Sequence, residues 1–308
     1  MATLLVTDPI FLEHLVLPGQ PERPDRLRAI AQSLAEEPFD ALVRKGAVAA
    51  DEDALMLAHD EDYVALIRDA APTEGFVRLD PDTAMMSKTW TVARHAAGSA
   101  MLAVDDVLSG SVKNAFVAAR PPGHHAERDR AMGFCFFNNA AIAARHAQRS
   151  HGIRRVAIVD WDVHHGNGTK AIFYEDPTVL YASTHQMPLY PGTGAESERG
   201  VGNIFNAPLP PGADGAAFRT AFSRKVIPAV DAFQPELVIV SAGFDAHWRD
   251  PLASLKLKEE DFAWATVEVL ALAERHAGGR VVSLLEGGYD LTGLADSVAA
   301  HVGELMKA

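Results

Sequence analysis

Short apolar runs alternate with longer helical patterns along this chain, and this alternation is the feature that most constrains its fold. The runs are rich in β-branched residues and lie at residues 115–118, 156–159, 179–182, 237–241 and 281–285. Their hydrophobicity is nearly continuous, which predicts strands covered on both faces, as in a parallel sheet.

Helical patterns fill the segments between these runs. Ser87 is expected to cap a helix with apolar positions at Trp90, Ala93, Ala97 and Val104. Further helices are predicted at about residues 138–148, 216–233, 259–276 and 291–306. The pattern predicts one α/β domain over residues 1–308, a three-layer α/β/α sandwich with a mostly parallel central sheet. Ligands of such sheets bind beyond the carboxyl ends of the strands.

The composition narrows the class of partner. The chain has 308 residues, 48% of them hydrophobic, which is enough for a large core. Its formal net charge of −13 argues against a nucleic-acid partner, which would call for a basic stripe. The charge could favour cationic substrates by steering them electrostatically, but it is more typical of an ordinary acidic protein.

The cysteine count and the first residues indicate a compartment. A single cysteine, Cys135, excludes an intrachain disulfide framework and fits a reducing environment. The first apolar run is interrupted by Asp8 and Glu13 and does not resemble a signal peptide. Since no apolar stretch is long enough to span a membrane, we expect a soluble cytoplasmic protein without a membrane partner.

Polar side chains at two predicted strand ends suggest a metal site. Asp160, Asp162 and His164 alternate after one strand, so in extended chain they would project toward the same side, and Asp245 follows another strand. Buried charges need partners or a metal. Two carboxylates and an imidazole suit a catalytic divalent ion such as zinc. The alternative is a network of buried acids that backbone amides and neighbouring histidines satisfy.

Adjacent histidines and a tyrosine follow two other strands. His124 and His125 come after a Pro-Pro-Gly turn, where imidazole could transfer protons if Asp160 or Asn167 fixed its orientation. Tyr289 follows two glycines at the last strand end and could donate a hydrogen bond to a developing oxyanion. Taken singly, each has an ordinary interpretation: a histidine pair on a surface loop, or a tyrosine that caps the sheet.

Together these motifs resemble the histone deacetylase family, including its bacterial homologues and the acetylpolyamine amidohydrolases. The resemblance covers nearly the whole chain. It is carried by residues 21–24 (PERP), 120–125 (RPPGHH), 133–136 (GFCF), 160–168 (DWDVHHGNG), 190–194 (YPGTG), 241–245 (SAGFD) and 286–289 (EGGY). Asn167, where class I enzymes have aspartate, resembles the class II branch. The fold implied is the α/β/α sandwich shared by arginases and deacetylases.

The resemblance implies a role for each catalytic residue. Zinc would be bound by Asp162, His164 and Asp245. His125 would act as general base and then acid, and His124 mainly as an electrostatic partner. Asp160 would support His124, Asn167 would orient His125, and Tyr289 would polarise the acyl oxygen.

The resemblance also implies a substrate tunnel and a second ion. Gly133, Phe134, Tyr190 and Leu252 would line the tunnel. A structural potassium ion would use Asp160, Asp162, His164, Ser183 and Thr184, partly through backbone carbonyls. The implied activity is zinc-dependent removal of acyl groups from amines such as acetyl-lysine or acetylpolyamines.

Two departures and three alternatives remain. Gln20 stands where the family often has histidine, which would alter the entrance, and His247-Trp248-Arg249 is expected to shape the rim or a nearby loop. An arginase-type two-metal enzyme is disfavoured because Gly166 and His247 occupy the positions of its further carboxylates. A hydrolase of another small amide and a non-catalytic acyl-lysine binding module also stay open, as does a homo-oligomer.

Overall fold

The computed structural model describes residues 2–308. Within them, eight strands form one sheet in the order β2-β1-β5-β10-β9-β6-β7-β8, and every neighbouring pair is parallel. Its strands are β1 (Thr3–Val6), β2 (Val43–Lys45), β5 (Asn114–Val117), β6 (Val156–Asp160), β7 (Val179–Gln186), β8 (Ile204–Leu209), β9 (Leu237–Ala242) and β10 (Val281–Leu285). Strands β3 (Val77–Arg78) and β4 (Ala84–Met85) form a separate antiparallel pair.

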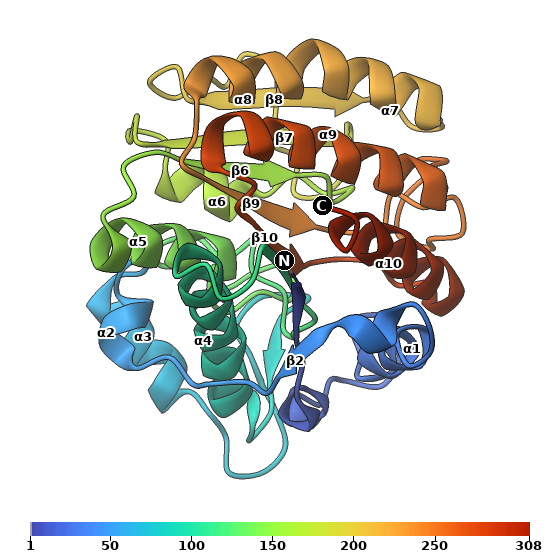
Figure 1. Ribbon diagram of the computed structural model, residues 1–308. Coiled ribbons are helices and arrows are strands. Elements are labelled where there is room, and N and C mark those ends of the chain that lie inside the picture. Colours follow the sequence, from blue (N-terminus) through green and yellow to red (C-terminus); the bar gives the residue numbers. More distant parts are fainter. Residues whose placement is uncertain (1) are drawn as a thin grey trace.

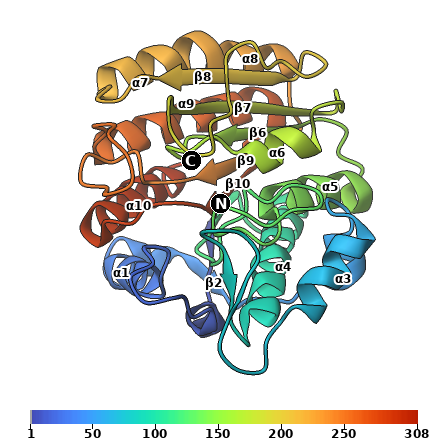
Figure 2. The same ribbon diagram turned by 180° about the vertical axis from the view of Figure 1, so that it is seen from behind.

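Helices pack against both faces of this sheet. They are α1 (Asp25–Ser33), α2 (Glu52–Leu55), α3 (Glu61–Asp69), α4 (Thr89–Leu108), α5 (Asn139–His151), α6 (Asn167–Ile172), α7 (Gly215–Ala221), α8 (Ile227–Phe233), α9 (Glu259–Ala277) and α10 (Leu291–Leu305). Short turns η1 (Pro9–Glu13) and η2 (Phe39–Ala41) and a π-helical segment η3 (Phe222–Val226) complete the elements. Helices α4 and α5 cover one face, and α1, α9 and α10 cover the other (Figures 1 and 2). The predicted α/β/α sandwich is therefore confirmed.

The sequence located the central strands well and the outer ones poorly. All five predicted strands exist, and the central ones are buried along their whole length, as continuous apolar runs require. Strand β7 extends four residues further than predicted because its polar end, through Gln186, is also buried. Strands β1, β2 and β8 were not predicted.

The helix boundaries follow local capping. Asn138 caps α5 by accepting a hydrogen bond from the Ala141 amide, close to the predicted start. The prediction that Ser87 caps α4 is wrong: the helix begins at Thr89, whose hydroxyl accepts from the Met86 amide. The single helix predicted over 216–233 is α7, η3 and α8 in direct succession.

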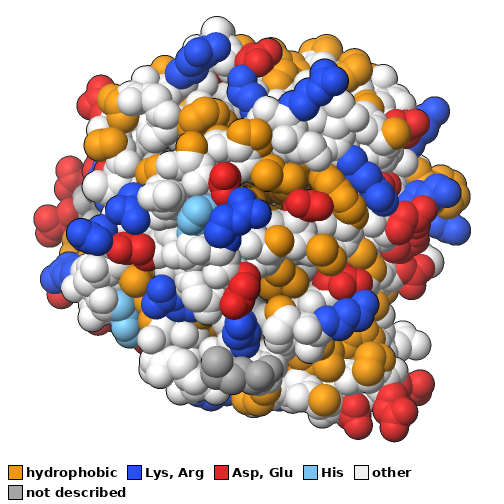
Figure 3. Space-filling model, turned by 45° about the horizontal axis from the view of Figure 1, so that its top comes forward, with side chains coloured by type: hydrophobic (Ala, Val, Ile, Leu, Met, Phe, Trp, Pro, Cys, Tyr) orange, Lys and Arg blue, Asp and Glu red, His pale blue; other side chains and the backbone are white. Residues whose placement is uncertain are grey.

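The surface charge and the apolar character of the helices are relevant to nucleic-acid and membrane partners. On the face shown in Figure 3, acidic and basic side chains are interspersed around hydrophobic ones and form no basic stripe. No helix within residues 2–308 is long and apolar enough to cross a membrane.

A buried ion network ties the N-terminal segment to the sheet. Glu22 pairs with Arg26 at 3.0 Å and with Arg120 at 2.8 Å, and all three side chains are buried. Arg26 also donates to the carbonyls of Glu286 and Gly288 after β10. Burial opposes ionisation, yet the two guanidinium groups lower the pKa of Glu22 to about 2.

We expect Glu22→Gln to lower the free energy of unfolding by about 3–5 kcal/mol, because it leaves two buried guanidinium charges underpaired. The full difference in unfolding free energy should be seen above pH 4.5, the ordinary pKa of glutamate. It should disappear as pH falls through about 2, because the wild-type carboxyl then becomes protonated as well. Urea denaturation at several pH values measures it. Exposed Glu13→Gln is the control, and equal stability of the two variants would contradict the role.

Candidate active site

The polar residues singled out in the sequence gather at the carboxyl ends of the strands. Asp160 is the last residue of β6, and Asp162 and His164 follow it. Asp245 lies three residues beyond β9, and Tyr289 four residues beyond β10. Since these strands are parallel and adjacent, their exits meet at one edge of the sheet.

Asp162, His164 and Asp245 converge as a set of metal-ligating atoms. One atom from each lies within 4.8 Å of the others. His164 Nδ1 is 3.1 Å from Asp162 Oδ1 and 3.1 Å from Asp245 Oδ2. The second oxygen of each carboxylate accepts a backbone amide: Gly287 donates to Asp162 and Val163 to Asp245, both at 2.8 Å. The His164 amide also donates to Asp162 Oδ1 at 2.9 Å, so backbone amides fix the direction of both carboxylates.

The charges of this cluster fit a cation. Burial and the neighbouring Asp162 raise the pKa of Asp245 to about 6. Burial lowers the pKa of His164, but hydrogen bonds to both carboxylates more than offset this and raise it to about 10. A divalent ion supplies the positive charge that the carboxylates otherwise draw from a protonated imidazole. Gly287 leaves the needed space, because a Cβ there would overlap the Asp245 carboxylate.

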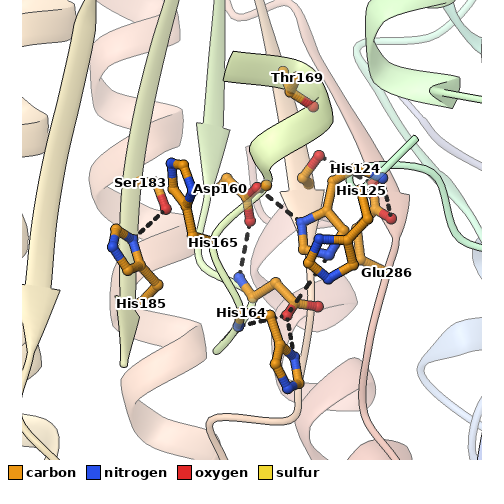
Figure 4. Close-up of polar contacts among 12 residues, drawn as sticks. His124, His125, Asp160, His164, His165, Thr169, Ser183, His185 and Glu286 are labelled. Atoms are coloured by element: carbon orange, nitrogen blue, oxygen red, sulfur yellow. Dashed lines mark hydrogen bonds and ion pairs between the residues drawn. The ribbon is translucent and has the colours of Figure 1, made fainter. Parts of the chain in front are cut away.

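Beside the cluster, His124 and His125 lie with their rings 4.0 Å apart (Figure 4). His124 Nδ1 is 3.0 Å from Asp160 Oδ2, and His125 Nδ1 is 2.8 Å from Asn167 Oδ1. The Asn167 amide donates to Glu127 at 2.7 Å, which leaves its oxygen facing His125. His125 Nδ1–H therefore donates to Asn167, and Nε2 is free as an acceptor.

The two imidazoles have opposite charge preferences. Burial disfavours the charged form of His124, but Asp162, Asp160 and Glu286 raise its pKa to about 10. Burial and the positive charge of His124 hold the pKa of His125 well below its ordinary value. The pair therefore consists of a cation and a neutral base.

A cavity of about 210 Å³ opens above these groups. Its lining contains Asp82, His125, Gly133, Phe134, His164, Leu189, Tyr190, Leu252 and Tyr289. The Phe134 ring meets the Tyr289 ring edge to face with centroids 6.0 Å apart. Burial and the charge of Asp245 keep the pKa of Tyr289 well above its ordinary value, so its hydroxyl stays protonated. The cavity combines apolar walls with a floor of proton donors, acceptors and metal ligands.

An unusual backbone shapes one wall of this cavity. Gly133 has φ 58°, and a Cβ there would overlap the His125 ring. Phe134 has φ 68°, which is rare for an aromatic residue. The amides of both residues are held, Gly133 by Asp82 and Phe134 by the Thr83 hydroxyl, each at 3.0 Å. Strain of this kind often accompanies functional sites, and here it sets the Phe134 ring.

The expected potassium ligands include Asp162 and His164 of the metal cluster and three residues on the neighbouring strands β6 and β7. Asp160 and Ser183 pair across β6 and β7, and the Thr184 hydroxyl is buried without a hydrogen-bond partner among residues 2–308. Ser183 Oγ is 2.9 Å from His185 Nδ1 (Figure 4). The expectation that Asp160, Asp162 and His164 alternate in extended chain is wrong beyond Asp160, because β6 ends there.

Comparison with known proteins identifies the family. The family profile described as histone deacetylase domain matches residues 20–305. The chain belongs to the histone deacetylase family. The histone deacetylase-like amidohydrolase of Pseudomonas aeruginosa is 42% identical over 88% of this chain and 73% of that protein. The human polyamine deacetylase HDAC10 is 40% identical over 92% of this chain and 44% of that protein. The crystal structure of the HDA15 HD domain superposes with a TM-score of 0.95 at 37% identity, covering 99% of this chain and 88% of that one.

Within this deacetylase fold, several supporting residues escaped the sequence analysis. Glu127 orients Asn167, Asp82 lies in the cavity wall, and Arg26 packs over the Tyr289 ring at 5.0 Å. Glu286 accepts from the amides of Gly123 and His124, and burial raises its pKa to about 7. Glu286 lay within a quoted motif. Loops position Asp82 and Glu127, and Arg26 lies on α1, so no strand pattern points to these three residues.

The departures from the family pattern have local explanations. Gln20 donates to the Asp82 carbonyl at 2.6 Å, so it contacts the loop of the entrance as expected. At Gly166 a Cβ would overlap the Asp160 carboxylate, so a further acidic ligand does not fit. Of the two roles expected for the segment 247–249, the rim does not fit His247, which is buried and lies 3.1 Å from Glu259, whereas the exposed Trp248 beside it leaves the role in a nearby loop as a prediction.

We expect Asp245→Asn to lose the divalent ion that stays bound through desalting, because the amide removes one of the carboxylate charges that bind it. Metal content by mass spectrometry tests this, with circular dichroism as a check of folding. Asp290→Asn is the matched control, since asparagine caps α10 as well as aspartate does. Metal content that is unchanged in Asp245→Asn would exclude the site.

Proposed function

We propose that this protein is a zinc-dependent amidohydrolase that removes acyl groups, acetyl in particular, from amines. The observation that carries the proposal is the lining of the 210 Å³ cavity, where His125 and Tyr289 lie with His164, a member of the Asp162–His164–Asp245 cluster. Membership of the histone deacetylase family supports it. A zinc ion held by the cluster would act as a Lewis acid on the acyl oxygen and lower the pKa of the attacking water.

His125 transfers the proton in this mechanism. Its free Nε2 removes a proton from the attacking water, and the new bond forms between the water oxygen and the acyl carbon. His125 then gives this proton to the amine nitrogen as the carbon–nitrogen bond breaks, releasing a carboxylic acid and an amine, which become carboxylate and ammonium when the acid proton passes to the amine. The hydrogen bond to Asn167 holds the ring in the required tautomer. His124 remains charged beside it and stabilises the negative charge that develops.

Tyr289 completes the mechanism by donating its hydroxyl hydrogen to the acyl oxygen as negative charge builds there. Arg26, above its ring, and the Phe134 edge keep the ring in place. Gly133, Phe134, Tyr190 and Leu252 would enclose the linear part of the substrate. A potassium ion near Asp160, Ser183 and Thr184 is also proposed, in the role of fixing the β6 exit.

We expect Tyr289→Phe to cost about 2.7–4 kcal/mol in transition-state stabilisation, a fall in kcat of roughly 10²–10³-fold, with zinc content unchanged. Steady-state kinetics on an acetyl-lysine amide, with metal analysis, measures it. Tyr174→Phe, at a 39% exposed position, is the control. Near-normal turnover with bound zinc would exclude the role of Tyr289.

The class of amine is proposed from the cavity wall. Asp82 is the carboxylate among the cavity-lining residues, which also include the apolar Leu252. The negative charge of Asp82 would attract a cationic amine of a polyamine. A peptide would need only an oxygen of Asp82 to accept a hydrogen bond from a backbone N–H group. The human relative is named a polyamine deacetylase, and we therefore include acetylpolyamines beside acetyl-lysine.

Asp82→Asn distinguishes these substrates because it keeps an acceptor for Gly133 and removes the charge. If polyamines are substrates, their kcat/KM should fall much more than that of an uncharged acetyl-lysine amide. The panel contains acetylated polyamines, peptides and small amides, each with and without chelator. Binding without turnover would favour a binding module, and ornithine release from arginine would favour an arginase-type enzyme.

A further inference from the structure

A second cluster of metal-ligating side chains lies outside the cavity. Asp105 on α4 places Oδ1 2.6 Å from His146 Nε2 and 2.6 Å from His151 Nε2, both on α5. The three ligand atoms lie within 4.8 Å of one another, and the two rings meet at 78°. Two imidazoles from one helix thus converge on one carboxylate oxygen of its neighbour.

A second aspartate with a similar setting shows what is unusual here. Asp231 Oδ1 also binds two groups, His276 and Arg275, and the side chains of His276 and His146 are both 13% exposed. The guanidinium there supplies a full positive charge. Asp105 forms no ion pair with a lysine or arginine among the described residues. Its partners are the imidazoles of His146 and His151. A carboxylate placed so can accept a metal cation between the rings.

We propose that Asp105, His146 and His151 form a second site for a divalent transition metal such as zinc. Two imidazole nitrogens and a carboxylate oxygen form an established ligand set for zinc, nickel or copper. The side chains of Asp105 and His151 are 47% and 27% exposed, so water completes the coordination. The nitrogen–oxygen distances lengthen modestly as the ion enters, which these side chains permit.

The topology separates this site from the catalytic one. Asp105 lies near the end of α4, which leads to the start of β5, and His146 and His151 end α5, which leads to β6. The second site is therefore at the amino edge of the sheet, opposite the cavity. An ion there joins α4 to α5, and it stabilises the folded chain by mass action without entering the reaction.

The test uses zinc-loaded protein that has been desalted, then dialysed against increasing zinc. We expect wild type to bind one further ion per chain and to gain thermal stability from it. His151→Gln should lose both effects and keep its turnover. His276→Gln is the matched control, because it removes a histidine–aspartate pair that lacks a second imidazole, and it should behave as wild type.

A wild-type chain that takes up no further zinc would overturn the proposal, as would equal uptake by His151→Gln. Should His151→Gln fail to fold, Asp105→Asn supplies the same test at a half-exposed side chain. Loss of the second ion in that variant, with the catalytic ion retained, would support the site.

Discussion

Four carboxyl groups buried at one edge of the sheet are the constraint on which the rest of this structure depends. Asp160, Asp162, Asp245 and Glu286 are almost wholly excluded from water. Burial and mutual repulsion oppose their ionisation, so the protein must supply compensating charge and hydrogen bonds. Backbone amides of neighbouring loops and the charged His124 provide part of this compensation, and the proposed metal ion would provide the rest. The cavity gives a substrate access to the groups that provide this compensation.

The ion network of Glu22, Arg26 and Arg120 acts one layer further out. It is buried as deeply as the carboxylates, and it connects α1, the β5 exit and the turn after β10. Arg26 binds the carbonyls of that turn and covers the Tyr289 ring. Arg26, paired with Glu22, thus fixes the shape of the turn after β10. Burying these charges costs desolvation free energy, which the rest of the fold must offset.

The central strands could be predicted from the sequence because strands buried on both faces need continuous apolar runs. The residues directly after them could be predicted because the carboxyl ends of parallel strands lie at one edge of the sheet. Sequence reasoning missed β1 and β8, which lie among polar or proline-containing segments. It also missed Asp82 and Glu127, because loops without periodicity bring Asp82 to the cavity and Glu127 to Asn167. The contact of His247 with Glu259 on α9 could not be predicted for a similar reason, because it joins a loop residue to a different element.

The two clusters of metal-ligating residues differ in how their ligands are held, and this difference assigns their roles. At the cavity, the Gly287 and Val163 amides orient Asp162 and Asp245 before an ion binds. The entropy cost of ordering these ligands is therefore part of folding and not of ion binding. At Asp105 the ligands are side chains on two helix surfaces, with exposed fractions between 13% and 47%, and their contacts of 2.6 Å must lengthen to admit an ion. A site whose ligands are fixed by the backbone can present an open coordination position to a substrate, whereas an ion held between two helix surfaces stabilises the contact that it bridges.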